Sequence, residues 1–318
     1  MTNLETDQNP ADDGWACWAT LARPLFKWAG GKQRFLWEHR ERIPEGFNTY
    51  HEPFGGGLSV FFHVAARSSS PVKAVLADVN LRVIRTYEEV KWEPDVVSDR
   101  LRQLEAGYNV ATDKVAFYLD VRAQHNRTYP RPDAARFIFL MKVAWNGVFR
   151  INQAGSFNVP HGNLKAALRL PSLEEVTGVS VALSQSRLRA QSWETGLNDM
   201  QPGDFAFFDP PYFHDDNRRD LYERNRVFTF SDQIRLADAL VDLKQRGVDF
   251  LLTNSARPQM IQLYRDRGLR VEEIEVHRSI SSKTQGRGRE GELVVTPGTQ
   301  SDSPQLIKAR LRLMMKDI

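Results

Sequence analysis

Residues 204–212 read DFAFFDPPY, an apolar run that ends in a carboxylate, two prolines and a tyrosine. The consecutive apolar residues are typical of a strand that is buried on both faces of a parallel sheet. Asp209 would then stand at the carboxyl end of this strand. Pro210 and Pro211 each fix φ and lack an N–H donor, so the chain stiffens immediately after the carboxylate. The stretch therefore predicts an α/β protein with a rigid ligand-binding loop at the carboxyl edge of its sheet.

The same loop has the chemistry of a clamp for a planar amine. The carboxylate of Asp209 and a rigid proline carbonyl are two acceptors for two N–H groups, and Tyr212 offers a ring on which a base stacks. Stacking contributes roughly 1–3 kcal/mol per base, which is comparable to the few kcal/mol that extruding a base costs. We therefore predict that Asp209, Pro210, Pro211 and Tyr212 form a catalytic loop for a flipped-out base with an exocyclic amine. The alternative is a proline turn that merely ends a buried strand.

Upstream, a strand, a glycine loop, a helix and a second strand follow one another. A short strand at 51–54 runs into Gly55, Gly56 and Gly57, and the strand at 73–78 ends in Asp78. Glycines let the backbone approach a ligand closely, and an acid at the next strand end suits ribose hydroxyls. This order predicts a βαβ unit with ligands at the carboxyl ends of its strands. The spacing lacks the GxGxxG pattern and so argues against a nicotinamide cofactor; a tight turn is the alternative for the glycines.

Changes of pattern divide the chain. Residues 95–190 are helical at first, then loop-rich and scattered with arginine, which indicates an inserted domain. Strand patterns resume at 204–209, 248–254, 271–280 and 291–295, and Ser231 is expected to cap a helix that Gly247 ends. We predict a flexible leader at 1–23, a catalytic core from 24–94 and 191–298, an inserted domain at 95–190, and a basic tail at 299–318.

Composition excludes several classes of protein. The single Cys17 leaves no internal disulfide framework and no cysteine-rich zinc site. No apolar run approaches the roughly 18 residues that span a bilayer, and the polar, acidic N-terminus is unlike a signal peptide. A cytoplasmic protein is expected. The net charge of +3 and pI near 8.9 are only mildly basic, so a polyanionic partner has to be argued from the distribution of charge.

Several motifs, taken together, resemble one family. They are FKWAGGK (26–32), HEPFGGG (51–57), LADVN (76–80), WNGVFRIN (145–152), SFNVPHG (156–162), FFDPPY (207–212), LLTN (251–254) and RSISS (278–282). In this order they resemble the Dam-type DNA adenine-N6 methyltransferases, which belong to the alpha class of amino-methyltransferases. The resemblance implies a Rossmann-like, mostly parallel core that uses S-adenosylmethionine, with an inserted, mainly helical target-recognition domain. It also implies methylation of the N6 amine of a flipped-out adenine in duplex DNA, at GATC or a related short site, without a metal.

The resemblance further implies a role for each matched position. Asp209 and the Pro210 carbonyl would accept the two N–H groups of the target amine. The cofactor would be bound by Trp28, Lys32, Phe54, Gly56, Asp78 and Asp209. DNA would be contacted by Lys27, Asn146, Val148, Arg150, Asn152, Pro160, Arg278, Ser281 and Lys283.

Other interpretations remain at this stage. Trp28 could be simple core, Lys32 an exposed lysine at a helix start, and Arg150 a plain surface charge. Two departures from the family pattern bear on these roles. Leu58 stands where the family often has another glycine in the glycine loop. In the DNA-reading loop, Val148 and Leu164 stand where better-known members have other side chains, which leaves the exact recognition sequence open.

The rival functions are a methyltransferase for RNA or protein and a non-catalytic DNA-binding protein on the same scaffold. The expected partners are double-stranded DNA and a cognate restriction nuclease, with a monomer in solution and a bacterial or phage origin.

Overall fold

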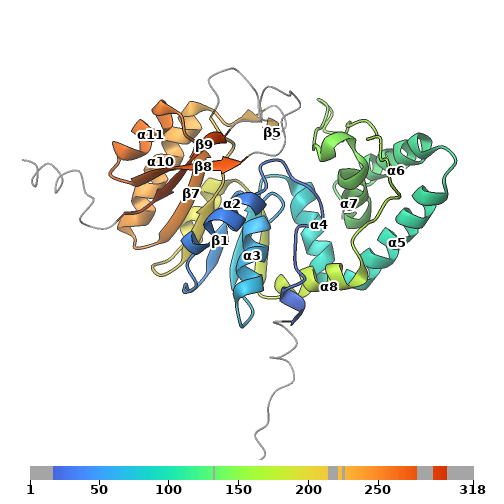
Figure 1. Cartoon of the computed structure of the whole chain (residues 1–318), viewed down its shortest axis with the longest axis horizontal. Helices are drawn as coiled ribbons and strands as arrows, with labels where there is room; N and C mark the ends of the chain where they lie inside the picture. The colour runs from blue at the N-terminus through green and yellow to red at the C-terminus, as the bar shows by residue number, and fades with distance from the viewer. Residues whose placement is uncertain (1–16, 132, 214–220, 224–225, 278–288, 299–318) are drawn as a thin grey trace, which may run out of the picture.

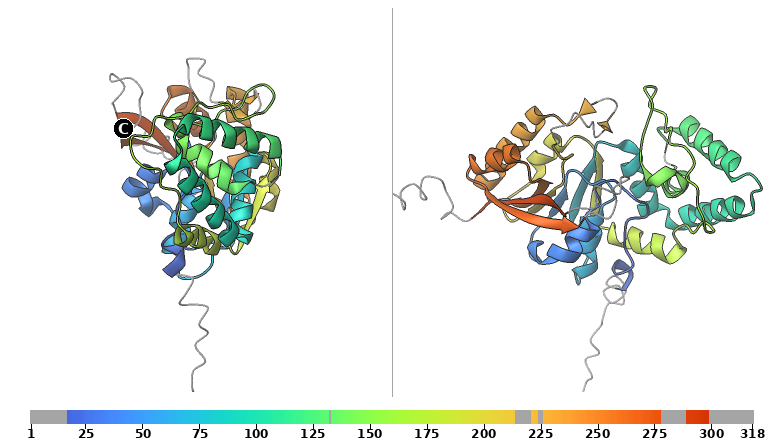
Figure 2. Two further views of the ribbon diagram at one scale, coloured as in Figure 1. Left: turned by 90° about the vertical axis from the view of Figure 1, so that its right-hand side faces the viewer. Right: turned by 45° about the horizontal axis from the view of Figure 1, so that its top comes forward.

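The computed structural model describes residues 17–131, 133–213, 221–223, 226–277 and 289–298. It has two parts that lie side by side, a sheet covered by helices and a mainly helical part that contains α5, α6 and α7 (Figure 1). Figure 2 shows the same arrangement from two further directions. Within the described ranges, no helix is long and apolar enough to cross a membrane.

Seven strands of the described chain form one sheet in the order β3-β2-β1-β4-β7-β9-β8. The first five in this order are parallel, whereas β9 runs antiparallel to both β7 and β8. A mostly parallel sheet is thus confirmed. The strands are β1 (Tyr50–Glu52), β2 (Ala74–Asp78), β3 (Ser186–Ala190), β4 (Phe205–Phe208), β7 (Asp249–Ser255), β8 (Arg270–His277) and β9 (Arg289–Thr296).

Alternation along β4 explains how the sheet is covered on both faces. Phe205 and Phe207 pack into the cluster that includes α2 and α3, whereas Ala206 and Phe208 pack into the cluster that includes α10 and α11. Successive side chains of a strand point to opposite faces, so an apolar run suits a strand between two helical layers. These helices are α2 (Gln33–His39), α3 (Ser59–Arg67), α10 (Phe230–Gln245) and α11 (Pro258–Arg265).

The helical part is built largely from the segment that follows α4 (Leu81–Trp92). Its helices are α5 (Pro94–Val110), α6 (Lys114–Thr128), α7 (Ala134–Val143) and α8 (Leu173–Ala182). β3 follows α8 and pairs in parallel with β2, so residues 186–190 belong to the sheet. The sequence pattern of these residues did not predict a strand.

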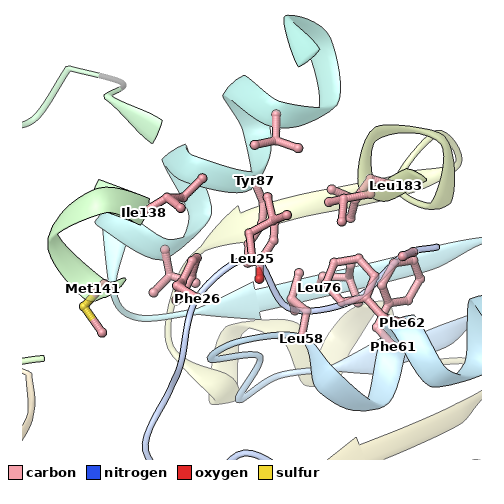
Figure 3. Packing of buried hydrophobic residues seen from close by; sticks show 14 of the residues in the cluster. Leu25, Phe26, Leu58, Phe61, Phe62, Leu76, Tyr87, Ile138, Met141 and Leu183 are labelled. Carbon is pink, nitrogen blue, oxygen red and sulfur yellow. The ribbon is translucent and has the colours of Figure 1, made fainter. Parts of the chain in front are cut away.

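One apolar cluster continues from the sheet into the helical part. Phe26 lies against both Tyr87 of α4 and Phe137 of α7, with ring centroids 5.5 and 5.3 Å apart. Figure 3 shows Phe26 among labelled residues of this cluster, which include Phe61 of α3 and Met141 of α7. The two parts are therefore joined by shared side-chain packing.

Local capping differs from the sequence expectation at α10. Thr229, rather than Ser231, caps this helix: its hydroxyl accepts from the backbone N–H of Asp232, whose carboxylate accepts from the N–H of Thr229. This reciprocal pair satisfies two of the donors that a helix start leaves unpaired. Gly247 follows the helix with φ of 75°, as expected for a glycine that ends a helix.

The described part of the N-terminal segment also packs on the body. Ala19 and Ala22 are buried in the main cluster. A Cβ placed on Gly178 of α8 would lie 2.9 Å from the carbonyl oxygen of Trp18, so the glycine permits a close approach.

Candidate active site

The glycine loop and the DPPY loop meet at one edge of the sheet. β1 pairs with β2 on one side and with β4 on the other, so the chain order reverses between β1 and β4. In open α/β sheets, ligands bind in the crevice outside the carboxyl ends of the strands at such a switch point. Residues 55–57 follow β1, and Asp209 follows β4.

Asp78 is buried beside the glycine loop and is held by backbone amides. One carboxylate oxygen accepts from the N–H of Gly56 at 2.8 Å and the other from the N–H of Asn80 at 2.7 Å. The N–H of Gly55 donates to the carbonyl of Ala77 at 2.8 Å. A buried carboxylate held in this way at the end of β2 fits a group that presents paired hydroxyls there.

Leu58 adopts the left-handed conformation with φ of 57° directly after the glycine loop. This conformation costs a residue with a Cβ about 1–2 kcal/mol. The side chain is fully buried in the main cluster, and its packing offsets the strain. The loop thus follows its path without the glycine that the family often has at this position.

Lys32 is buried and joins the DPPY loop to the N-terminal segment. Its ammonium lies 2.7 Å from Oδ2 of Asp209 and donates to the carbonyl of Gly30 at 2.9 Å. It also lies 5.0 Å from the centroid of the Tyr212 ring. The interpretation of Lys32 as an exposed helix-start lysine is therefore wrong, although the residue does precede the first turn of α2.

A second carboxylate, Glu292 of β9, faces the same lysine. Its Oε1 lies 3.8 Å from Nζ of Lys32 and accepts a hydrogen bond from the Tyr212 hydroxyl. Burial raises the pKa of Glu292 to about 7, a shift that nearby Lys32 opposes and Asp209 reinforces. The site therefore contains an acid whose charge changes near neutral pH.

Polar side chains of β7 and α10 hold the DPPY loop by hydrogen bonds. Thr253 donates to Oδ1 of Asp209 at 2.8 Å, and Gln233 of α10 donates to the carbonyl of Pro211 at 2.9 Å. Asn254 in turn donates to Oε1 of Gln233 at 2.9 Å. The Pro211 carbonyl is thus engaged within the protein, which leaves the Pro210 carbonyl as the better candidate acceptor for a ligand.

Two aromatic residues that were expected at the cofactor pocket lie beside the glycine loop. The Trp28 ring packs so closely on Gly56 that a Cβ there would lie 2.6 Å from it, and it stacks on Phe149 with centroids 5.5 Å apart. Phe54 is buried and stacks on Trp193 with centroids 6.3 Å apart. Trp28 thus connects the glycine loop with the segment that resembles the DNA-reading loop.

The residues expected to read DNA form one loop beyond α7. Asn146, Val148, Arg150, Asn152 and Pro160 are all exposed. A turn at Asn152 orders their backbone. The side-chain oxygen of Asn152 accepts from the N–H of Ser156 at 3.0 Å, and its backbone oxygen accepts from the N–H of Gly155 at 2.9 Å.

Contacts with this loop position two residues that are expected to bind DNA, Arg150 and Lys27. Arg150 donates from Nε to Oδ1 of Asn158 at 2.9 Å, so its guanidinium has a defined direction. Lys27 is exposed, and a Cβ on Gly147 would lie 3.3 Å from its Cβ, so this lysine lies against the same loop.

Side chains of helix α6 form hydrogen bonds with the backbone of this loop. Asn126 forms two hydrogen bonds with the backbone of Phe157, and Tyr118 and Arg122 both donate to the carbonyl of Val159. The three side chains are spaced four residues apart and so share one face of the helix. Arg82 of α4 adds a bond to the carbonyl of Gly155 at 2.8 Å.

Arg278, Ser281 and Lys283 lie outside the described residues, as do residues 299–318 of the tail. In the part of the chain that is described, no group of three or more His, Cys, Asp or Glu side chains could hold a metal ion.

Sequence reasoning missed Glu292, Gln233 and the loop-supporting residues of α6. Glu292 had one weak signal, an acid in the apolar strand pattern GELVV. Gln233 and Asn126 carried none, because their partners lie 22 and 31 positions away in the chain.

A glycine loop with a buried acid on one side of the switch point, and an acid-headed DPPY loop on the other, defines a methyltransferase of the class that modifies exocyclic amines. Residues 28–280 match the family described as D12 class N6 adenine-specific DNA methyltransferase. The chain belongs to this family and is an adenine-specific DNA methyltransferase.

Named relatives agree with this assignment. The chain is 32% identical over 282 residues to the type II methyltransferase M1.LlaDCHI of Lactococcus lactis subsp. cremoris, covering 86% of this chain and 95% of that protein. It is 30% identical to a DNA adenine methylase of Vibrio cholerae, with 88% and 99% covered. It is 28% identical to the DNA adenine methylase of Escherichia coli, with 88% and 97% covered.

Proposed function

We propose that the protein binds S-adenosylmethionine between the glycine loop and the DPPY loop and methylates adenine at one short duplex site. Asp78 would accept from the ribose hydroxyls. Trp28, Lys32, Phe54 and Gly56 would line the pocket. The geometry supports this cofactor because the Asp78 carboxylate, held by backbone amides, stands at the end of β2 beside glycines that let a ligand approach.

Asp209 and the Pro210 carbonyl hold the target amine in this proposal. When bound, the cofactor supplies a sulfonium methyl group. With both N–H groups of the adenine held by Asp209 and Pro210, the nitrogen lone pair would be drawn out of conjugation. The methyl group would pass to this nitrogen as the carbon–sulfur bond breaks, S-adenosylhomocysteine would leave, and the nitrogen would lose one proton to solvent. Holding the amine favours this displacement by proximity and orientation. Tyr212, with Pro211 keeping the loop rigid, supplies the stacking surface for the extruded base.

We assign sequence recognition to the loop at 145–160 and to Lys27. Arg150 is the residue for a guanine edge in the major groove, where a bidentate contact discriminates by about 1–3 kcal/mol. GATC or a related short site is the proposed target. The division into core, recognition insert at 95–190, leader and tail belongs to the same proposal, with Arg278, Ser281 and Lys283 as phosphate contacts.

The observation that carries the proposal is the position of Asp209. It stands at the carboxyl end of β4, beside the glycine loop; Thr253 donates to one of its oxygens at 2.8 Å, and the Lys32 ammonium lies 2.7 Å from the other. We further propose a monomer in a bacterial or phage-infected cytoplasm, with a cognate restriction nuclease as one partner.

The test is expression in a host without adenine methylation, followed by sequencing that detects N6-methyladenine. Modification at one recurrent motif is expected, and its comparison with GATC reports on Arg150. Asp209→Ala should abolish modification while the protein still binds duplex DNA, because phosphate contacts lie elsewhere. Unmodified DNA from cells with soluble, cofactor-binding protein would contradict the proposal.

A further inference from the structure

Glu292 lies where it contacts two members of the DPPY site at once. It is only 6% exposed on β9 and pairs in register with Ser255 of β7 and Ile274 of β8. From this position its carboxylate accepts from the Tyr212 hydroxyl and approaches Lys32. An acid in the interior of a sheet is costly unless it has such partners.

We propose that Glu292 is a positioning residue for methyl transfer, which orients the Tyr212 ring through its hydroxyl and shares the Lys32 ammonium with Asp209. This inference rests on the proposed function. It assigns to β9, a strand outside the glycine and DPPY loops, a direct influence on the groups that hold the target base.

The Tyr212 ring is held at its hydroxyl by the carboxylate of Glu292. A tyrosine ring turns about its side-chain bonds unless its hydroxyl or its edges are held. The hydrogen bond to Glu292 joins the ring to a rigid strand. A base that stacks on Tyr212 therefore meets a surface whose tilt is already set, and orientation of this kind is worth orders of magnitude in rate.

The Lys32 contact affects Asp209. One ammonium lies between two carboxylates, at 2.7 Å from Asp209 and 3.8 Å from Glu292. An ionised Glu292 attracts the ammonium and so weakens its hold on Oδ2 of Asp209. This leaves that oxygen more available to the target amine in the proposed reaction. A protonated Glu292 leaves Lys32 to Asp209 alone.

The charge state of Glu292 therefore matters, and it changes in the neutral range. Burial raises its pKa to about 7, Lys32 lowers it, and Asp209 and Glu38 raise it; the Tyr212 hydroxyl also donates to it. Because the ionised form is the competent one, the methylation rate should fall as the pH drops below about 7.

A simpler role is that Glu292 only balances the charge of a buried lysine. That role would alter stability, but it would not give the rate of methyl transfer a pH dependence that disappears with the carboxylate. It would also leave the effects of changes at Glu292 and Tyr212 independent of each other.

The test is the single-turnover rate of methyl transfer against pH, with saturating S-adenosylmethionine and a duplex that carries the recognised site. The variants are Glu292→Gln, which keeps the volume but replaces the charge-assisted hydrogen bond from Tyr212 by a weaker neutral one, Tyr212→Phe, and the double variant. Glu272→Gln is the matched control, because this acid lies on the neighbouring strand and pairs instead with Arg42 and Arg270.

We expect Glu292→Gln to lower the rate about 10- to 100-fold, the range that loss of orientation gives, and to abolish the fall in rate below about pH 7. Affinity for S-adenosylmethionine should change by less than about twofold. The double variant should lose less than the product of the two single losses.

A wild-type pH profile in Glu292→Gln would overturn the inference, and so would strictly multiplicative losses. If Glu292→Gln does not fold, Tyr212→Phe carries the test alone, and a wild-type rate in that variant is the contrary result. A wild-type enzyme that methylates no DNA adenine would refute the proposed function itself. That failure is distinct from an active enzyme that is indifferent to Glu292.

Discussion

Glu52 gives a quantitative prediction about stability and pH. This acid of β1 is 3% exposed, and one of its oxygens accepts from the Tyr50 hydroxyl at 2.8 Å and from the N–H of Phe61 at 3.0 Å. It therefore ties the strand before the glycine loop to the first turn of α3. Burial raises its pKa from 4.5 to about 8, which its two hydrogen bonds only partly oppose.

The sign of the effect follows from proton binding. Near neutral pH the folded protein keeps a proton on Glu52, whereas the unfolded chain has released it. A state that binds more protons becomes less stable relative to the other as the pH rises. With pKa values of about 8 folded and 4.5 unfolded, Glu52 alone lowers the free energy of unfolding by about 2.5 kcal/mol between pH 5 and pH 7.

Glu52→Gln isolates this contribution. The amide keeps an oxygen for Tyr50 and Phe61 and does not titrate, so every other pH-dependent group is common to both proteins. Urea unfolding at pH 5 and pH 7 should show that the wild type loses about 2–3 kcal/mol more than the variant. Equal losses in the two proteins would refute the assignment of a neutral, buried Glu52.

Three further predictions concern the glycine loop, the recognition loop and the DNA. Leu58→Gly should be more stable than Leu58→Ala by about 1 kcal/mol in thermal or urea unfolding, because both lose the same packing but only glycine tolerates positive φ without strain; the reverse order would contradict the left-handed conformation. Asn126→Ala should weaken binding of the recognised duplex about tenfold, since it removes both hydrogen bonds to Phe157. Affinity for S-adenosylmethionine should stay unchanged, and Gln124→Ala on the same helix is the control; equal DNA affinity in the two variants would argue against support of the loop by α6. The DNA association constant should fall linearly with salt on a log–log plot, because lysine and arginine contacts release counterions; a flat plot would point away from phosphate contacts.

The sequence predicted the central strands because their signals are local. An apolar run that ends in an acid, as at Asp209 and Asp78, reports both burial and the sheet edge. β3 was missed because Ser186–Ala190 alternates charged and apolar residues at the sheet edge and is mostly exposed. Its place in the sheet depends on pairing with β2, which no short window of sequence shows.

The site was predictable where motifs are contiguous and unpredictable where it depends on distant partners. The proximity of Lys32 to Asp209 was implied only by the family resemblance, since the two are 177 positions apart in the sequence. Glu292 and Tyr212 are 80 positions apart. At α10, Thr229 displaced the expected Ser231 as the cap because its reciprocal bonds with Asp232 satisfy one more donor.

The continuous cluster around Phe26 has a consequence for engineering. Chimaeras that exchange whole recognition segments between relatives assume that the segment is a module with its own interior. Here Phe137 and Met141 of α7 share their packing with Phe26 and Tyr87. A graft that ends at 95 and 190, the proposed boundaries of the insert, would therefore leave mismatched surfaces on both sides. With recognition assigned to the loop at 145–160 as proposed, new specificity is better sought by replacing exposed side chains of that loop and leaving α7 in place.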